Sequence, residues 1–309
     1  MRRKIQLKDW VSVIVLAILV AVLGILSKGS LFSGLNIKNL LEQSMQVIIG
    51  ASGVIFIIAM GSTDLSIGGT AAVSATVASV VANKLGFVWF FPLSIGIGLL
   101  CGWFIGIIVT KCKVSSFMCT LAMLIALKGF LNVFVTSSVV LAPMQITKLN
   151  TIWFKVGMTL VIVIVMGYIF ECTRFGRICK AMGENEQMVI SMGVNVDRVR
   201  IKAYMLSGLM ASFVGIFQLM QQYGSSATMG SFLEMKVMMA IFLGGVLVTG
   251  GFSSKVYKMI IGALMISVMV TGLYLAGVGQ DYLNAVEGIL LMVVLFMTMQ
   301  LNKGKTRAD

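Results

Sequence analysis

The sequence predicts an all-α, polytopic membrane protein with about ten transmembrane helices, some of them short or broken. Of the 309 residues, 59% are hydrophobic and 11% are charged, and the mean hydropathy is +1.02. Soluble domains carry about 25% charged residues, whereas an apolar helix of about 20 residues crosses the hydrocarbon core of a bilayer. We therefore expect a single transmembrane domain over residues 1–309, embedded in lipid.

The composition also argues against several functions. The chain contains no histidine, which removes the commonest metal ligand and the commonest general base. Its five cysteines lie in or beside apolar runs, at no zinc-like spacing. We therefore expect no catalytic residues, no metal, no cofactor and no nucleotide site. The net charge of +13 does not indicate nucleic acid, because the basic residues cluster beside apolar runs as they do in membrane proteins.

Polar or glycine-containing stretches divide the chain into apolar segments. The segments are expected at 10–27, 44–60, 70–82, 88–110, 116–136, 156–170, 203–222, 236–249, 259–276 and 281–299. The eighth is too short to cross comfortably and contains Gly244 and Gly245. It is predicted to be a re-entrant or broken helix that is buried in protein.

The distribution of positive charge predicts the orientation. Counting alternate loops from a cytoplasmic N-terminus gives four Lys and Arg in the first arm and two after the fourth segment. Six more lie in residues 173–202, two before the ninth segment and three in the tail, so 17 of the 24 share one side. Cytoplasmic loops carry such an excess, so both termini and residues 173–202 are expected in the cytoplasm.

Residues 173–202, called the polar segment below, have the pattern of a short helix with defined ends. Asn185 is placed to cap the helix, with Glu186 in its first turn, and Gly193 is suited to end it in a left-handed conformation. Met188, Val189 and Met192 are expected on one face, and Asn195 offers a second cap. These residues alone leave two interpretations open, a helix that docks on a partner and an ordinary solvated loop.

Three polar residues near or inside the apolar segments are candidate site residues. Asp64 with Ser66 is expected to cap the third helix, in flanks polar enough to be solvated. An acid beside a broken membrane helix is alternatively a translocation-path candidate. Lys128 lies within the fifth segment, where it extends its ammonium toward the membrane surface, pairs with an acid such as Glu287, or lines a water-filled path.

Small residues recur at four-residue spacing in two of the apolar segments. Such residues let helices approach closely, so both rows are expected to form packing surfaces. The rows are Gly98, Gly102 and Gly106 in the fourth segment and Ser207, Ala211 and Gly215 in the seventh.

Three stretches resemble the permease subunits of bacterial ABC importers, in the branch for ribose, xylose and other simple sugars, within the superfamily that includes branched-chain amino acid permeases. The first is GSTDLSIGG at 61–69, the second is 174–215, and the third is 234–251, with Leu-Gly-Gly at 243–245 and a glycine pair at 250–251. The resemblance departs at Lys236, where the family usually has an acid, and at residues 253–255. These departures leave the substrate and the partner permease open.

The resemblance implies a mechanism. Such permeases pair as homodimers or heterodimers in the bacterial cytoplasmic membrane, receive solute from an extracytoplasmic binding protein, and are driven by a separate cytoplasmic ABC ATPase. The polar segment would be the coupling segment and residues 183–193 its coupling helix. The residues implied in ATPase coupling are Gly183, Glu184, Asn185, Glu186, Met188 and Gly193.

The resemblance does not name the solute. A monosaccharide such as ribose is expected, and an autoinducer-type sugar, a nucleoside or a branched-chain amino acid is the alternative. A secondary transporter would need coupling acids at mid-span. The deeply placed charged residue in this sequence is a base, Lys128, which argues against that class of transporter.

Overall fold

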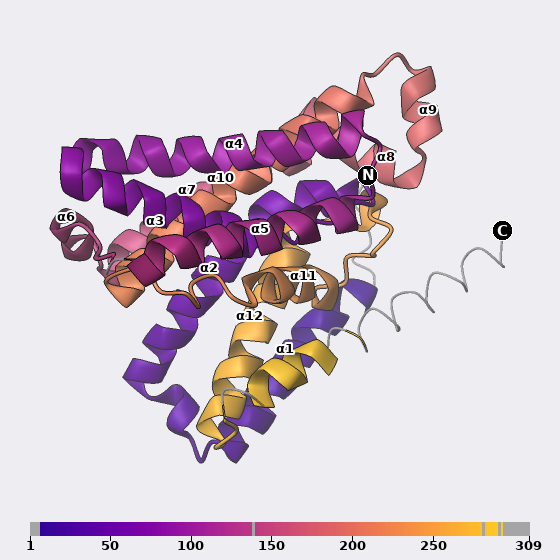
Figure 1. Ribbon diagram of the computed structural model, residues 1–309. Helices are drawn as coiled ribbons and strands as arrows, with labels where there is room; N and C mark the ends of the chain where they lie inside the picture. The colour runs from indigo at the N-terminus through magenta and orange to yellow at the C-terminus, as the bar shows by residue number, and fades with distance from the viewer. Residues whose placement is uncertain (1–6, 138–139, 280–281, 290–291, 293–309) are drawn as a thin grey trace.

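The computed structural model describes residues 7–137, 140–279, 282–289 and 292, and this part of the chain is helical without a named strand. Between residues 7 and 275 of this part, eight long helices are joined by four short helices and three single 3₁₀ turns (Figure 1). The long helices are α1 (Leu7–Leu26), α2 (Gly34–Ala59), α3 (Ile67–Leu85), α4 (Phe90–Lys111), α5 (Ser116–Ser137), α7 (Ile152–Cys172), α10 (Val196–Gln222) and α12 (Val256–Leu275). The short ones are α6 (Met144–Lys148), α8 (Arg174–Glu184), α9 (Glu186–Ser191) and α11 (Leu233–Leu243).

The all-α, polytopic class is therefore confirmed. Six helices in the described residues are long and apolar enough to cross a membrane: α2, α4 with the turn before it, α5, α7, α10 and α12. Residues 12–26 of α1 form a shorter apolar helical stretch. Most of the tenth expected segment, 281–299, lies outside the described residues, so the predicted span count and the positions of the termini stay predictions.

Helices α2 and α10 form the centre of the molecule. The second half of α2, residues 44–59, is buried along its whole length, and α10 packs against α2, α3 and α4. The predicted small-residue packing is confirmed where α4 meets α10. A Cβ added to Gly98 or Gly102 would collide with the backbone of Gly208 or Tyr204, so these helices approach as closely as glycine permits.

The expected eighth segment is a short, interrupted helix, as the sequence predicts. Helix α11 has 11 residues, which span about 16 Å at 1.5 Å per residue, against about 30 Å of hydrocarbon. It ends at Leu243 with Gly244 as its C-cap, and Gly245 takes a left-handed φ of 91°. Its residues are largely buried against α2 and α12, so its free backbone groups are enclosed in protein rather than exposed to lipid.

The long helices give the molecule two distinct ends. Helices α8 and α9 lie at one end, in contact with the C-terminus of α2, the N-terminus of α10 and the 3₁₀ turn at Gly251–Ser253 (Figure 1). Helix α6 lies at the far end in the same view. The chain therefore presents one short-helix surface at each end of a helical bundle.

Candidate functional site

The polar segment forms the short helix and the two caps that its sequence predicts, and it also forms a second short helix, α8, that the sequence reasoning did not separate. The Asn185 side chain accepts a hydrogen bond from the Met188 N–H at 3.0 Å, and Asn195 accepts one from Arg198 N–H at 3.0 Å. Gly193 takes a left-handed φ of 77° just after α9. The division between helices falls at Asn185, so Gly183 and Glu184 belong to the end of α8 and α9 is only six residues long.

The prediction that Met188, Val189 and Met192 share one face of α9 is wrong for Val189. Met188 and Met192 are 63% and 71% exposed, whereas Val189 is 4% exposed and packs into the core. Residues four apart share a helix face, but neighbouring residues are turned by about 100°. Ile190 is also exposed, so the exposed apolar side chains of α9 and its C-cap are Met188, Ile190 and Met192.

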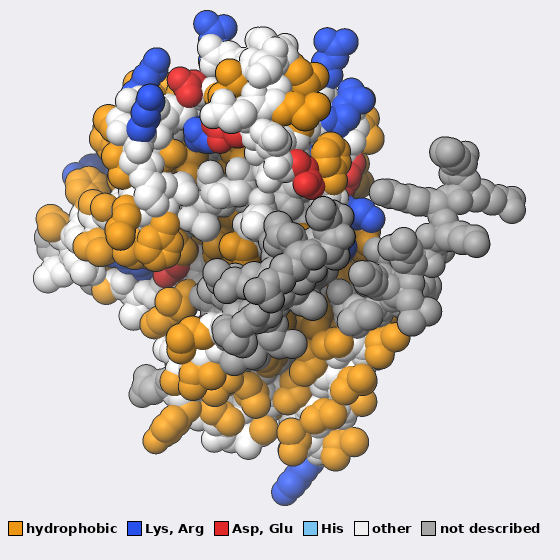
Figure 2. All heavy atoms as spheres, turned by 90° about the vertical axis from the view of Figure 1, so that its right-hand side faces the viewer, with side chains coloured by type: hydrophobic (Ala, Val, Ile, Leu, Met, Phe, Trp, Pro, Cys, Tyr) orange, Lys and Arg blue, Asp and Glu red, His pale blue; other side chains and the backbone are white. Residues whose placement is uncertain are grey.

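Two acids of the polar segment, Glu184 and Glu186, bind other parts of the protein. Both carboxylate oxygens of Glu186 accept hydrogen bonds from Arg200 Nη2, at 2.9 and 2.8 Å. Glu184 accepts one from the Phe252 N–H at 2.9 Å, which ties the end of α8 to the turn before α12. Figure 2 views the end that carries α9, where Lys and Arg side chains surround small hydrophobic patches at the top. The exposed cations of the segment are Arg174, Arg177, Arg198 and Lys202.

Asp64 is buried, which corrects the prediction of a solvated helix cap. It is 2% exposed, and its carboxylate accepts hydrogen bonds from Ser66 N–H at 2.9 Å, Ser66 Oγ at 2.6 Å and Ser207 Oγ at 2.6 Å. The Ser66 side chain makes no cap bond to α3. Burial raises the pKa of the Asp64 carboxyl above its usual value, and the hydrogen bonds oppose part of that shift. Asp64 therefore joins the α2–α3 turn to α10.

Lys128 has a structural partner other than the one predicted. Its ammonium donates to Met229 O at 2.5 Å and to Ser231 Oγ at 2.9 Å, and so attaches α5 to the turn before α11. Glu287 instead pairs with Lys236 of α11, with 3.5 Å between Nζ and Oε1. The predicted Lys128–Glu287 pair is therefore wrong, because α11 supplies the cation that reaches Glu287.

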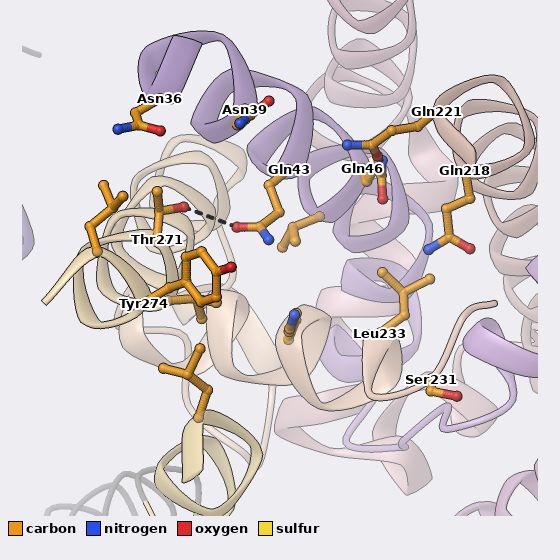
Figure 3. A pocket seen from close by; sticks show the side chains of 15 residues that line it. Asn36, Asn39, Gln43, Gln46, Gln218, Gln221, Ser231, Leu233, Thr271 and Tyr274 are labelled. Carbon is orange, nitrogen blue, oxygen red and sulfur yellow. Dashed lines mark hydrogen bonds between the residues drawn. The ribbon is translucent and has the colours of Figure 1, made fainter. Parts of the chain in front are cut away.

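A cavity that the sequence reasoning missed lies between α2, α10, α11 and α12. Its volume is about 420 Å³, and six carboxamide side chains line it from two helices, together with hydroxyl groups and one ammonium group (Figure 3). We call it the amide cavity. Its polar lining residues are Asn36, Asn39, Gln43, Gln46, Gln218, Gln221, Ser231, Lys236, Thr271 and Tyr274.

Two hydrogen bonds hold part of this lining in place. Gln46 Nε2 donates to Gln221 Oε1 at 2.7 Å, and Thr271 Oγ1 donates to Gln43 Oε1 at 3.2 Å (Figure 3). The buried Oε1 of Gln218 has no hydrogen-bond partner among the described residues. Buried polar atoms are rarely left unpaired, so this oxygen is suited to accept from water or from a solute hydroxyl.

The signal for the cavity was present in the sequence. Asn36, Asn39, Gln43 and Gln46 are spaced by three, four and three residues, which places them on one face of a helix. Gln218 and Gln221 are three apart near the end of α10. Carboxamides on one face of an apolar helix indicate a polar lumen, because such groups are costly against lipid.

Comparison with known proteins places this arrangement in a family. Residues 36–295 match the family described as branched-chain amino acid transport system / permease component. The chain belongs to this family. The ribose import permease protein RbsC of Escherichia coli (strain K12) is 30% identical over 308 residues, covering 95% of this chain and 94% of that protein. No solved structure shows a significant match.

Other relatives have different sugars in their names. The fructose import permease protein FrcC of Rhizobium meliloti is 28% identical, over 95% of this chain and 86% of that protein. The galactofuranose transporter permease protein YtfT of Escherichia coli (strain K12) is 28% identical, over 89% and 82%. The resemblance to sugar import permeases is thus confirmed, and the chain is a multi-pass permease of the bacterial cytoplasmic membrane rather than a catalytic subunit.

Proposed function

We propose that this permease is the membrane subunit of an ATP-driven importer for a monosaccharide such as ribose. The amide cavity is the observation that carries the proposal. A carboxamide offers both donors and an acceptor, as a sugar hydroxyl requires, and carries no charge to be desolvated. The volume of about 420 Å³ lies within the range of about 300–1,000 Å³ for small-molecule sites.

The amide cavity and the polar segment lie at opposite ends of the same helices. The cavity is lined by the first half of α2 and the last turns of α10 and α12. The polar segment contacts the other ends of α2 and α10 and the 3₁₀ turn that precedes α12. With the N-terminus in the cytoplasm, the cavity faces outward, where an extracytoplasmic binding protein would deliver solute. A movement at the cytoplasmic end is thereby connected to the cavity through continuous helices.

The polar segment supplies the docking surface for a cytoplasmic ABC ATPase in this proposal. Met188 and Met192 are the exposed apolar contacts, while Asn185 and Gly193 fix the two ends of α9. Gly183, Glu184 and Glu186 act indirectly. The two acids hold α8 and α9 against the rest of the permease, so that force on α9 reaches the bundle.

ATP hydrolysis belongs to the partner ATPase in this scheme. The membrane assembly contains two permease subunits, either two copies of this chain or this chain and a related one. Asp64, Ser66 and Lys128 serve as positioning residues, because their polar groups join helices rather than line the amide cavity.

Co-purification with the cognate ATPase tests the docking surface. Met188→Asp places a charge in the exposed apolar patch, and Met144→Asp makes the same change on exposed α6 at the other end. We expect the ATPase to remain with the intact chain and with Met144→Asp and to be lost with Met188→Asp. Equal retention by two well-folded variants would place the docking surface elsewhere.

A further inference from the structure

Lys236 is the only charged residue among the described residues that line the amide cavity. It lies in the first turns of α11, beside Leu233, and its side chain is 18% exposed. The rest of the polar lining consists of neutral amides and hydroxyls. A single uncompensated ammonium in this setting would attract anionic solutes and repel cationic ones.

The charge of Lys236 is compensated from behind the cavity wall. Glu287 lies 3.5 Å from the Lys236 ammonium but is only 2% exposed and is absent from the lining. Its second oxygen, Oε2, has no hydrogen-bond partner among the described residues. A buried carboxylate with one free oxygen depends on its cation, so the two residues behave as one neutral unit.

We propose that Glu287 sets the charge specificity of the amide cavity by neutralising Lys236. The pair lets the cavity take neutral polyhydroxy solutes while keeping an ammonium donor for a solute hydroxyl. Removing the carboxylate leaves a net positive lumen, which favours anionic sugars such as uronates and aldonates. The identity of the solute as a sugar rests on the proposed function, but the charge assignment does not.

A cysteine reporter in the cavity measures this charge directly. Thr271 is a near-isosteric site, and its side chain faces the lumen from α12 (Figure 3). Thr271→Cys in the full chain is allowed to react with an anionic and with a cationic alkyl thiosulfonate of similar size. The ratio of the two rates reports the local potential. Reaction of the chain without the reporter gives the background from its own cysteines.

Three variants of the reporter chain, each with glutamine in place of a charged residue, separate the effect of charge from an effect on folding. We expect Glu287→Gln to raise the anionic-to-cationic rate ratio by about tenfold, because the unbalanced ammonium would attract the anionic reagent and repel the cationic one. Lys236→Gln is expected to lower the ratio, and the double variant Lys236→Gln/Glu287→Gln to restore the parental value. If Glu287→Gln does not fold, Lys236→Gln and the double variant carry the same comparison.

The outcomes distinguish this inference from the proposed function. A ratio that stays at the parental value in the folded single variants overturns the charge assignment, and makes the ion pair a structural contact only. In a parallel experiment, the chain with Thr271→Cys alone is tested for protection of the reporter cysteine by D-ribose. If D-ribose does not protect the reporter but the rate ratio shifts in the single variants, ribose is rejected as the solute and the charge assignment stands.

Discussion

Substitution of Gly102 tests the close contact between α4 and α10. A Cβ at this position in α4 would lie 2.8 Å from the Tyr204 carbonyl carbon and 2.9 Å from Met205 Cα, and nearer still to the Tyr204 oxygen. These neighbours are backbone atoms of α10, which cannot rotate away as a side chain can. We therefore expect Gly102→Ala to lower the free energy of unfolding by about 1–3 kcal/mol, the usual cost of overpacking a core.

Gly129 in α5 provides a matched control. It is also a helical glycine in a membrane-spanning helix, but nothing lies within 4 Å of its added Cβ. Gly129→Ala should be neutral or stabilising by up to about 1 kcal/mol, because alanine favours the helix. Unfolding in mixed detergent micelles measures both variants. If Gly102→Ala unfolds no more easily than Gly129→Ala, the close α4–α10 contact does not exist as described.

Three further substitutions test the polar contacts. Asp64→Ala leaves three buried donors unpaired and should lower the free energy of unfolding by about 3 kcal/mol or more, measured by detergent denaturation. Lys128→Met removes the bond to Met229 O and should speed proteolysis of the turn before α11, while global stability falls by about 1–3 kcal/mol; unchanged cleavage would contradict the contact. Gln46→Leu removes the hydrogen bond to Gln221 and places an apolar group in the cavity, so ribose uptake by the assembled importer should fall about tenfold or more. Permease abundance, measured by immunoblot, should be unchanged. Normal uptake would argue against the cavity as the sugar path.

The sequence by itself determined the class of the protein and the local form of the polar segment. Long apolar runs require helices in lipid, because a lipid-exposed backbone must satisfy its own hydrogen bonds. The caps at Asn185 and Asn195 and the left-handed turn at Gly193 depend on side chains only a few residues away. Such local chemistry can be predicted from one segment at a time.

Only the tertiary structure decided which polar groups meet. Within a membrane, helix faces toward lipid and toward the core are both apolar: Ile164 is exposed and Ile57 is buried, and composition does not separate them. The sequence pattern therefore did not reveal that Asp64 is enclosed by α10, or that Glu287 pairs with Lys236 rather than Lys128. The amide cavity likewise exists because α2 packs beside α10, α11 and α12, which lie far from it in the chain, and their polar side chains face one point.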